Sequence, residues 1–120
     1  MKRVAFAVLV MFAACKKQAA APAEHDPSAA PKMPVAELKR GQDACKAYVD
    51  RVCACVEKVP VVKEQCGLAK ALPDAIEVSE QVSSSPESSK LDVLHAQDSI
   101  RKTVKECIEE TAKLPALGCP

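Results

Sequence analysis

Aromatic side chains are scarce in this sequence, whose 120 residues include no tryptophan, one tyrosine and two phenylalanines. Phe6 and Phe12 both lie near the amino terminus, so Tyr48 is the single aromatic residue in the rest of the chain. Proteins that bind single-stranded nucleic acids commonly stack the bases on aromatic rings. The shortage argues against a stacking platform for bases or sugars. It also leaves Val, Leu, Ile and Ala to supply nearly all of the buried area.

Catalytic motifs are missing as well, because the sequence contains no G-x-S-x-G, H-E-x-x-H or phosphate-loop pattern. His95 is the one histidine beyond residue 34. Helical spacing from Val104 places it on the face opposite the apolar stripe. A general base needs partners within hydrogen-bond reach, and spacing supplies none for His95. We expect His95 to be a solvated surface residue, and we expect the protein to be neither an enzyme nor dependent on a cofactor or metal.

A run of apolar residues long enough to cross a membrane is also absent. The apolar run at residues 4–14 has 11 residues, whereas a transmembrane helix needs about 20. Lys2 and Arg3 precede this run, and Cys15 and two lysines follow it. This layout is typical of a secretory signal, so we expect residues 1–14 to be a signal peptide.

The segment Phe12-Ala13-Ala14-Cys15 resembles the lipobox of bacterial lipoprotein signal peptides, although the family usually has Leu where Phe12 stands. The resemblance covers the first fifteen residues. It implies that Cys15 receives a diacylglyceryl group, that cleavage precedes it, and that its new amino group is acylated, with palmitate as the expected fatty acid. Several acyl chains anchor a protein stably in a membrane. An ordinary secretory protein, cleaved after the alanines at 19–21, is the alternative.

Lys16 is not the Asp by which some bacteria retain lipoproteins on the inner membrane. The family resemblance therefore favours the outer membrane, with the domain facing the periplasm or the exterior. Charge indicates no further partner, because the 17 basic and 16 acidic residues become 15 and 16 without Lys2 and Arg3. Both signs are interspersed, and nucleic-acid binding normally needs a clustered basic face. We therefore expect no nucleic-acid partner.

The rest of the chain divides into a tether at residues 15–34 and a helical domain at residues 35–120. The tether contains four prolines, many alanines and no apolar period, which is typical of a semi-extended spacer. Apolar residues then recur at helical spacing in three segments. The segments are expected at residues 34–59, at residues 61–82 with a kink or division at Pro73, and at residues 86–114, where Ser85 is the expected cap.

Three amphipathic segments joined by short connections predict an all-α fold, a small three-helix bundle with up-down-up topology. No alternation typical of strands competes with it. The chain has seven cysteines, and six remain if Cys15 carries lipid. In an exported domain, an even number of cysteines is most simply explained by disulfide bonds. We therefore predict that the following six are fully paired: Cys45, Cys53, Cys55, Cys66, Cys107 and Cys119.

Two alternatives use Cys53 and Cys55, which form a C-x-C pair: a thiol-redox site and a metal-binding site. Helical geometry opposes both, because residues two apart point about 200° away from each other. A redox pair is also expected at a helix N-terminus, whereas this pair lies near a helix C-terminus. Stabilisation by disulfides is the favoured interpretation, in an envelope lipoprotein with a structural or protein-interaction role and an unknown partner.

Helical wheels and expected heights in the bundle suggest how the six cysteines connect. On the first helix, Cys53 and Cys55 flank the apolar stripe on opposite sides. Cys55 and Cys66 lie almost symmetrically about the turn at Pro60. Cys53 and Cys107 lie about equally far from the expected starts of two parallel helices. The favoured pairs are therefore Cys55–Cys66, Cys53–Cys107 and, with the tail folded back, Cys45–Cys119.

Overall fold

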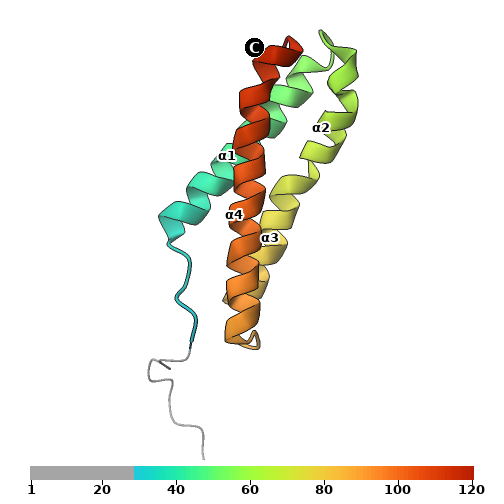
Figure 1. Cartoon of the computed structure of the whole chain (residues 1–120). Helices are drawn as coiled ribbons and strands as arrows, with labels where there is room; N and C mark the ends of the chain where they lie inside the picture. Colours follow the sequence, from blue (N-terminus) through green and yellow to red (C-terminus); the bar gives the residue numbers. More distant parts are fainter. Residues whose placement is uncertain (1–28) are drawn as a thin grey trace, which may run out of the picture.

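The protein folds as a helical bundle in a computed structural model that describes residues 29–120. One arm runs up, a second arm of two helices runs down, and a third runs up again (Figure 1). The predicted all-α fold is therefore confirmed, and no strand occurs among the described residues. The α-helices are α1 (Val35–Cys55), α2 (Lys63–Ala69), α3 (Ala71–Ser84) and α4 (Lys90–Lys113), with the 3-10 helices η1 (Pro60–Val62) and η2 (Leu114–Leu117).

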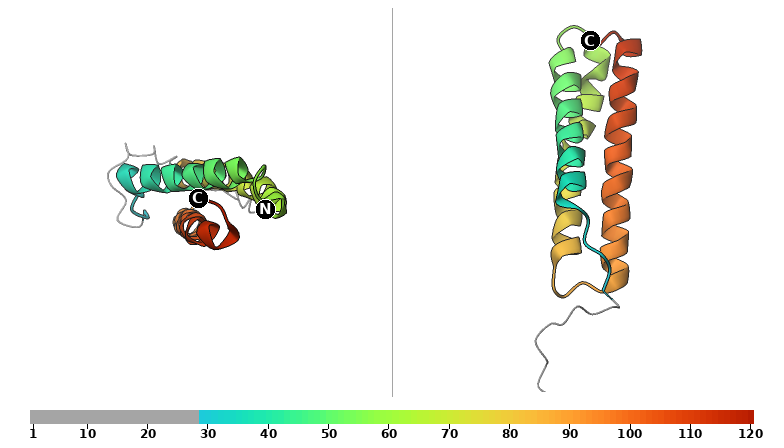
Figure 2. Two further views of the ribbon diagram at one scale, coloured as in Figure 1. Left: turned by 90° about the horizontal axis from the view of Figure 1, so that it is seen from above. Right: turned by 90° about the vertical axis from the view of Figure 1, so that its left-hand side faces the viewer.

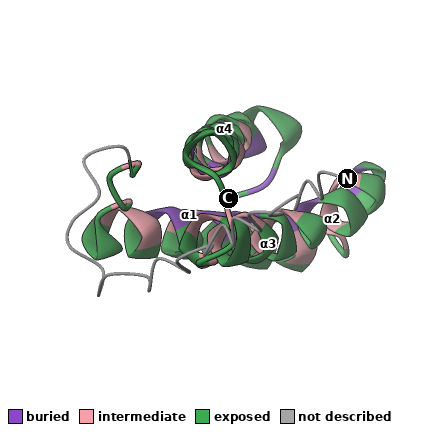
Figure 3. Ribbon diagram, turned by 90° about the horizontal axis from the view of Figure 1, so that it is seen from below, coloured by how far each residue is buried: buried purple, intermediate pink, exposed green. Residues whose placement is uncertain are grey.

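The bundle has two ends that differ in what they carry. The end that we call the lower end holds the connection between α3 and α4, and the described chain enters there (Figure 1). The upper end holds the turn after α1, the start of α2 and the carboxyl terminus. Viewed along the bundle, α1 and the α2–α3 arm lie together on one side of α4 (Figure 3).

The descending arm divides where the sequence predicts a break, because α2 ends at Ala69 and α3 begins at Ala71. Pro73 has no N–H to donate to the carbonyl of Ala69, and its ring crowds that carbonyl. The break therefore lies about one helical turn before the proline, at Lys70. It leaves α2 as a separate helix of seven residues.

The last helix, α4, begins at Lys90 rather than at residue 86, so the prediction that Ser85 caps it is wrong. Ser89 is the cap: its hydroxyl accepts from the backbone N–H of Asp92 at 3.2 Å, and its own N–H donates to the Asp92 carboxylate at 3.0 Å. Hydrogen bonds from the Ser89 hydroxyl and then its N–H hold the pKa of Asp92 below its ordinary value. Ser85 instead ends α3 in an extended conformation, because a following proline disfavours helical geometry.

The first helix also ends earlier than expected, at Cys55 rather than near residue 59. The N–H groups of Lys58 and Val59 both donate to the carbonyl of Cys55, at 3.0 and 2.8 Å. The chain therefore forms a tight turn between Cys55, the last residue of α1, and Pro60. The connection to α2 takes up four residues that the sequence pattern assigns to the helix.

The core is built from aliphatic side chains and cysteines, as the shortage of aromatics predicts. Tyr48 contributes the one aromatic ring among the described residues, and it is 4% exposed. Ile76, Leu114 and Val52 are the largest fully buried side chains. The cluster of buried residues consists of Cys45, Tyr48, Val52, Cys55, Val62, Ala69, Ile76, Ile100, Cys107, Leu114 and Cys119.

The first helix starts level with the middle of α4, not with its lower end. Glu37, in the first turn of α1, accepts from the Arg101 guanidinium at 2.7 Å. One turn further on, Gly41 lies directly against Val104, and a Cβ atom at position 41 would be 2.5 Å from a Val104 methyl carbon. The glycine therefore allows α1 to approach α4 closely as the two helices cross (Figure 1).

Residues 29–34 cover the part of α4 that α1 leaves bare (Figure 2). The side chain of Gln97, a buried polar residue, donates from Nε2 to the carbonyl oxygen of Pro31 at 2.7 Å. Met33 packs against the core cluster. The last six residues of the predicted tether thus lie against the bundle, whereas residues 1–28, including the predicted signal peptide and Cys15, lie outside the described part of the chain.

Replacing Gly41 with alanine should destabilise the bundle, because the new methyl group would overlap Val104. Overpacking typically costs about 1–3 kcal/mol, which outweighs the gain of about 0.8–1.0 kcal/mol from replacing a helical glycine. Gly67→Ala is the matched control, since Gly67 lies within α2 and a Cβ atom added there would meet no other atom within 4 Å. Urea unfolding of the oxidised protein measures both free energies. The packing described for α1 and α4 is wrong if Gly41→Ala is as stabilising as Gly67→Ala.

Candidate functional site

All six cysteines of the domain are joined in three disulfides, as predicted from their number. In each pair the two Cα atoms are 4.8–5.6 Å apart, within the range of 4.4–6.8 Å usual for disulfides. One bridge joins α1 to α4, one joins α1 to α2, and one joins α1 to the carboxyl-terminal segment. The bridges are Cys45–Cys107, Cys53–Cys66 and Cys55–Cys119.

The three favoured pairings are nevertheless wrong, and the first reason is the register of α1 against α4. The predicted pair Cys53–Cys107 assumes that both helices start at the same height. Because α1 starts level with the middle of α4, Cys45 lies at the height of Cys107 and bonds to it. The error is eight residues, or about 12 Å along a helix. Cys45 is then no longer available to Cys119.

The second reason is the hand of the bundle. The helical wheel correctly separates Cys53 and Cys55 onto opposite flanks of α1, since each bonds to a different element. It does not indicate which neighbour lies on which flank. In the structure Cys53 faces α2 and bonds to Cys66, while Cys55 bonds to Cys119. One sequence signal favours the observed pair Cys45–Cys107: both residues belong to the apolar stripes of their helices.

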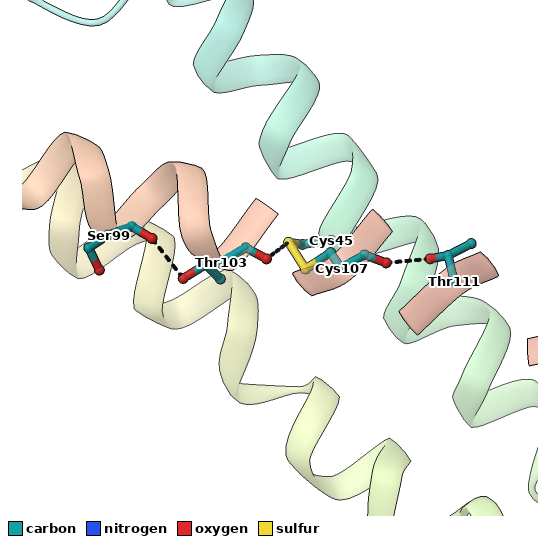
Figure 4. The surroundings of a disulfide bond; sticks show 5 residues. All are labelled: Cys45, Ser99, Thr103, Cys107 and Thr111. Carbon is teal, nitrogen blue, oxygen red and sulfur yellow. Dashed lines mark hydrogen bonds between the residues drawn. A yellow bond between two sulfur atoms is a disulfide. The ribbon is translucent and has the colours of Figure 1, made fainter. Parts of the chain in front are cut away.

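The central bridge joins Cys45 to Cys107, and two threonine hydroxyls bond to backbone carbonyls near it (Figure 4). Cys45 and Cys107 are both 0% exposed. The Thr111 hydroxyl donates to the Cys107 carbonyl at 2.7 Å, and the Thr103 hydroxyl donates to the Ser99 carbonyl at 3.0 Å. The Cys45 sulfur, which has no proton in a disulfide, lies 3.8 Å from the Thr103 carbonyl oxygen. This bridge therefore belongs to the core.

The carboxyl-terminal segment folds back over the upper end, as the sequence predicts. Gly118 takes the left-handed conformation with φ +87°, which glycine adopts at little cost. The chain reverses there, and the Cys119 N–H donates to the Leu114 carbonyl at 3.0 Å. This reversal brings Cys119, 2% exposed, onto Cys55.

The residues of the alternative sites do not come together. Cys53 and Cys55 belong to separate bridges, so they do not form a bond with each other. Across residues 29–120, no group of three or more His, Cys, Asp or Glu side chains is placed to hold a metal ion. His95 is exposed on α4, which confirms the prediction for this residue.

A hollow of about 430 Å³ lies between α2 and α4, and Tyr48 of α1 is one of the residues that line it. The side-chain oxygen of Gln65, a residue of its wall, is buried without a hydrogen-bond partner. Burial raises the pKa of Tyr48 above its ordinary value of 10.0, and the charges of Glu110 and Glu106 add to the shift. The hollow is lined by Tyr48, Gln65, Leu68, Ala69, Leu72, Glu106 and Glu110.

Comparison with protein-family models, curated proteins and solved structures finds no match. Within the described range, no helix combines the length and the apolar character needed to cross a membrane.

The three disulfides should differ in how much they stabilise the fold. In the chain-entropy model, closing a loop of about 15 residues stabilises by about 3 kcal/mol, and closing one of about 100 residues by about 4.7 kcal/mol. Cys45 and Cys107 are 62 residues apart, whereas Cys53 and Cys66 are 13 apart. Because Cys55–Cys119 stays intact, the shortest loop that the central bridge closes is about 22 residues, which is still longer than that of Cys53–Cys66. Cys45 and Cys107 are also fully buried, so Cys45→Ala/Cys107→Ala should lose more unfolding free energy than Cys53→Ala/Cys66→Ala. Urea unfolding measures the difference, and the reverse order would contradict the assignment of the central bridge to the core.

Proposed function

We propose that this chain is a lipid-anchored protein of the bacterial envelope, with a helical domain in a non-enzymatic structural or protein-interaction role. The observation that carries the proposal is the pairing of the cysteines. Six of the seven cysteines bond to one another within the domain. The seventh, Cys15, directly follows the apolar run at residues 4–14, which is the position where lipoprotein signals place the lipidated cysteine.

The disulfides also support export. Such bonds form and persist in oxidising compartments outside the cytosol and are rare within it. Three of them in one small domain suit the periplasm or the cell exterior, which is where a signal at residues 1–14 would deliver the chain. The cysteine framework and the amino-terminal segment are independent features of the sequence, and both favour the same location.

The exposed charges of the domain support a solvated surface rather than a reacting one. Ion pairs between residues three or four apart on one helix include Lys39–Asp43 and Lys102–Asp98. The Lys102 ammonium group lowers the pKa of Asp98. Across α1 and α4, the hydrogen bond between Arg101 and Glu37 lowers the pKa of Glu37 and raises the pKa of Arg101. Exposed pairs of this kind are common on helices and contribute little to stability.

The position at which the chain joins the bundle indicates how the anchored domain would be oriented relative to the membrane. Residues 29–34 leave the bundle at its lower end (Figure 2), so a lipid on Cys15 would tie that end to the membrane. The 13 residues between Cys15 and Ala29 span at most about 50 Å. The upper end, with Cys119 and the turn after α1, would point away from the bilayer. The outer membrane is favoured, because Lys16 is not the aspartate associated with retention on the inner membrane.

Replacing Cys15 with alanine should abolish membrane attachment, because the lipid is expected to be bonded to its sulfur. The wild type should sediment with membranes and carry added fatty acyl mass on its amino-terminal peptide. Cys15→Ala should carry none, and it should accumulate with residues 1–14 still attached. A matched control, Lys16→Ala, should be processed and lipidated normally. A wild-type chain without lipid mass, together with a variant cleaved at the same site, would refute the proposal.

A further inference from the structure

The three disulfides differ sharply in how accessible they are. The two long-range bridges are buried, since Cys45, Cys107, Cys55 and Cys119 are all 0–2% exposed. Both partners of the third bridge, Cys53 and Cys66, are instead partly exposed at the edge of the core. Thiol–disulfide exchange requires a thiolate to reach a disulfide sulfur. The bridge between α1 and α2 is therefore the most exposed of the three and the one that an external thiol should reach first.

The element that this bridge holds is short and buries few residues. The helix α2 has seven residues, fewer than the roughly 12–15 that a marginally stable isolated helix needs. Its one buried residue is Ala69, and the preceding η1 buries Val62. Pro73 lacks the N–H that would bond to Ala69 at the end of α2, so the link between α2 and α3 is one helical hydrogen bond weaker. The side-chain oxygen of Gln65 in α2 is buried without a hydrogen-bond partner, so it does not help to hold α2 in place.

We propose that Cys53–Cys66 is a thiol-exchange site at which a protein dithiol reduces this bridge alone and releases η1 and α2 from α1. The partner is a thiol–disulfide oxidoreductase with a reduced C-x-x-C pair. This site differs from a Cys53–Cys55 redox pair, because Cys55 stays bonded to Cys119. The proposal does not depend on lipidation of Cys15.

The reaction balances as an exchange of two electrons. A thiolate of the partner attacks one sulfur of the bridge, forms a mixed disulfide and releases the other cysteine as a thiolate, which takes up a proton. The second thiol of the partner loses its proton and attacks the mixed disulfide at the partner's own sulfur. The second cysteine leaves and is protonated. Cys53 and Cys66 end as thiols, and the partner ends as a disulfide.

The remaining bridges keep the rest of the domain together during this reaction. Cys45–Cys107 still joins α1 to α4, and Cys55–Cys119 still joins α1 to the carboxyl-terminal segment. Movement of α2 instead opens the hollow that it lines with Leu68 and Ala69 and that Tyr48 also lines. Reduction thus changes the surface at one place, beside the upper part of α4.

Tyr48 reports this opening, because it is the only tyrosine and the chain has no tryptophan. Its pKa is raised above 10.0 mainly by burial, further raised by Glu110 and Glu106 and lowered by Lys113. All three charged residues lie on α4, which stays crosslinked to α1. Release of α2 removes burial and leaves these charges in place, so the tyrosinate absorbance should titrate at lower pH in the reduced protein.

The test is stepwise reduction of the oxidised protein under native conditions with reduced thioredoxin, in parallel with dithiothreitol, followed by alkylation and peptide mass analysis. We expect Cys53 and Cys66 to be labelled first and at least tenfold faster than the other four cysteines with both reductants. The Tyr48 titration should move toward 10.0 in that two-thiol species. Cys53→Ser/Cys66→Ser should show the same Tyr48 titration without reduction and no fast labelling phase.

Three results would overturn the proposal. The first is labelling of all six cysteines together, or of a buried bridge before Cys53–Cys66. The second is fast reduction by dithiothreitol but not by thioredoxin, which would leave an accessible bridge that protein dithiols do not use. The third is an unchanged Tyr48 titration in the two-thiol species, which would show that α2 stays in place. Because the measurement uses the wild-type protein, failure of the serine variant to fold would not weaken it.

Discussion

The packing of α1 against α4 at Gly41 and Cys45 is the constraint on which the rest of the structure depends. Gly41 lets the two helices approach, and the Cys45–Cys107 bridge fixes their height one turn further on. From that register, Cys55 lies at the upper end of α1 within reach of the returning carboxyl terminus. The lower half of α4 remains uncovered by α1, and residues 29–34 fill that position through Met33 and the Gln97–Pro31 hydrogen bond.

The shortage of aromatic residues explains why covalent bonds are so prominent in this core. Apolar burial is the dominant favourable contribution to folding, and small exported domains with limited cores use disulfides to compensate. Here Cys45, Cys107 and Cys119 are among the largest fully buried side chains, next to Ile76 and Leu114. Cysteine thus serves both as core packing and as a crosslink at these positions. The partly exposed Cys53–Cys66 bridge serves mainly as a crosslink, and this difference underlies the proposed exchange site.

Local features of the fold could be predicted from the sequence, whereas its long-range geometry could not. The apolar stripe through Cys45 and the break before Pro73 follow from helical periodicity and proline stereochemistry, and both are confirmed. The number of cysteines predicted full pairing, but the pairs depend on register and hand, which no periodicity encodes. Ser89 could have been recognised as the cap of α4, because Asp92 follows it at capping-box spacing. Lipidation at Cys15 remains a prediction.

The disulfide map of the unreduced mature protein tests the register between α1 and α4 most directly. Trypsin should release Cys45 in a peptide of residues 41–46, Cys107 in residues 106–113 and Cys119 in residues 114–120. The structure predicts that the peptide of residues 41–46 is joined to that of residues 106–113. A bond from residues 41–46 to residues 114–120 would instead pair Cys45 with Cys119, and it would contradict the account of how this bundle is assembled.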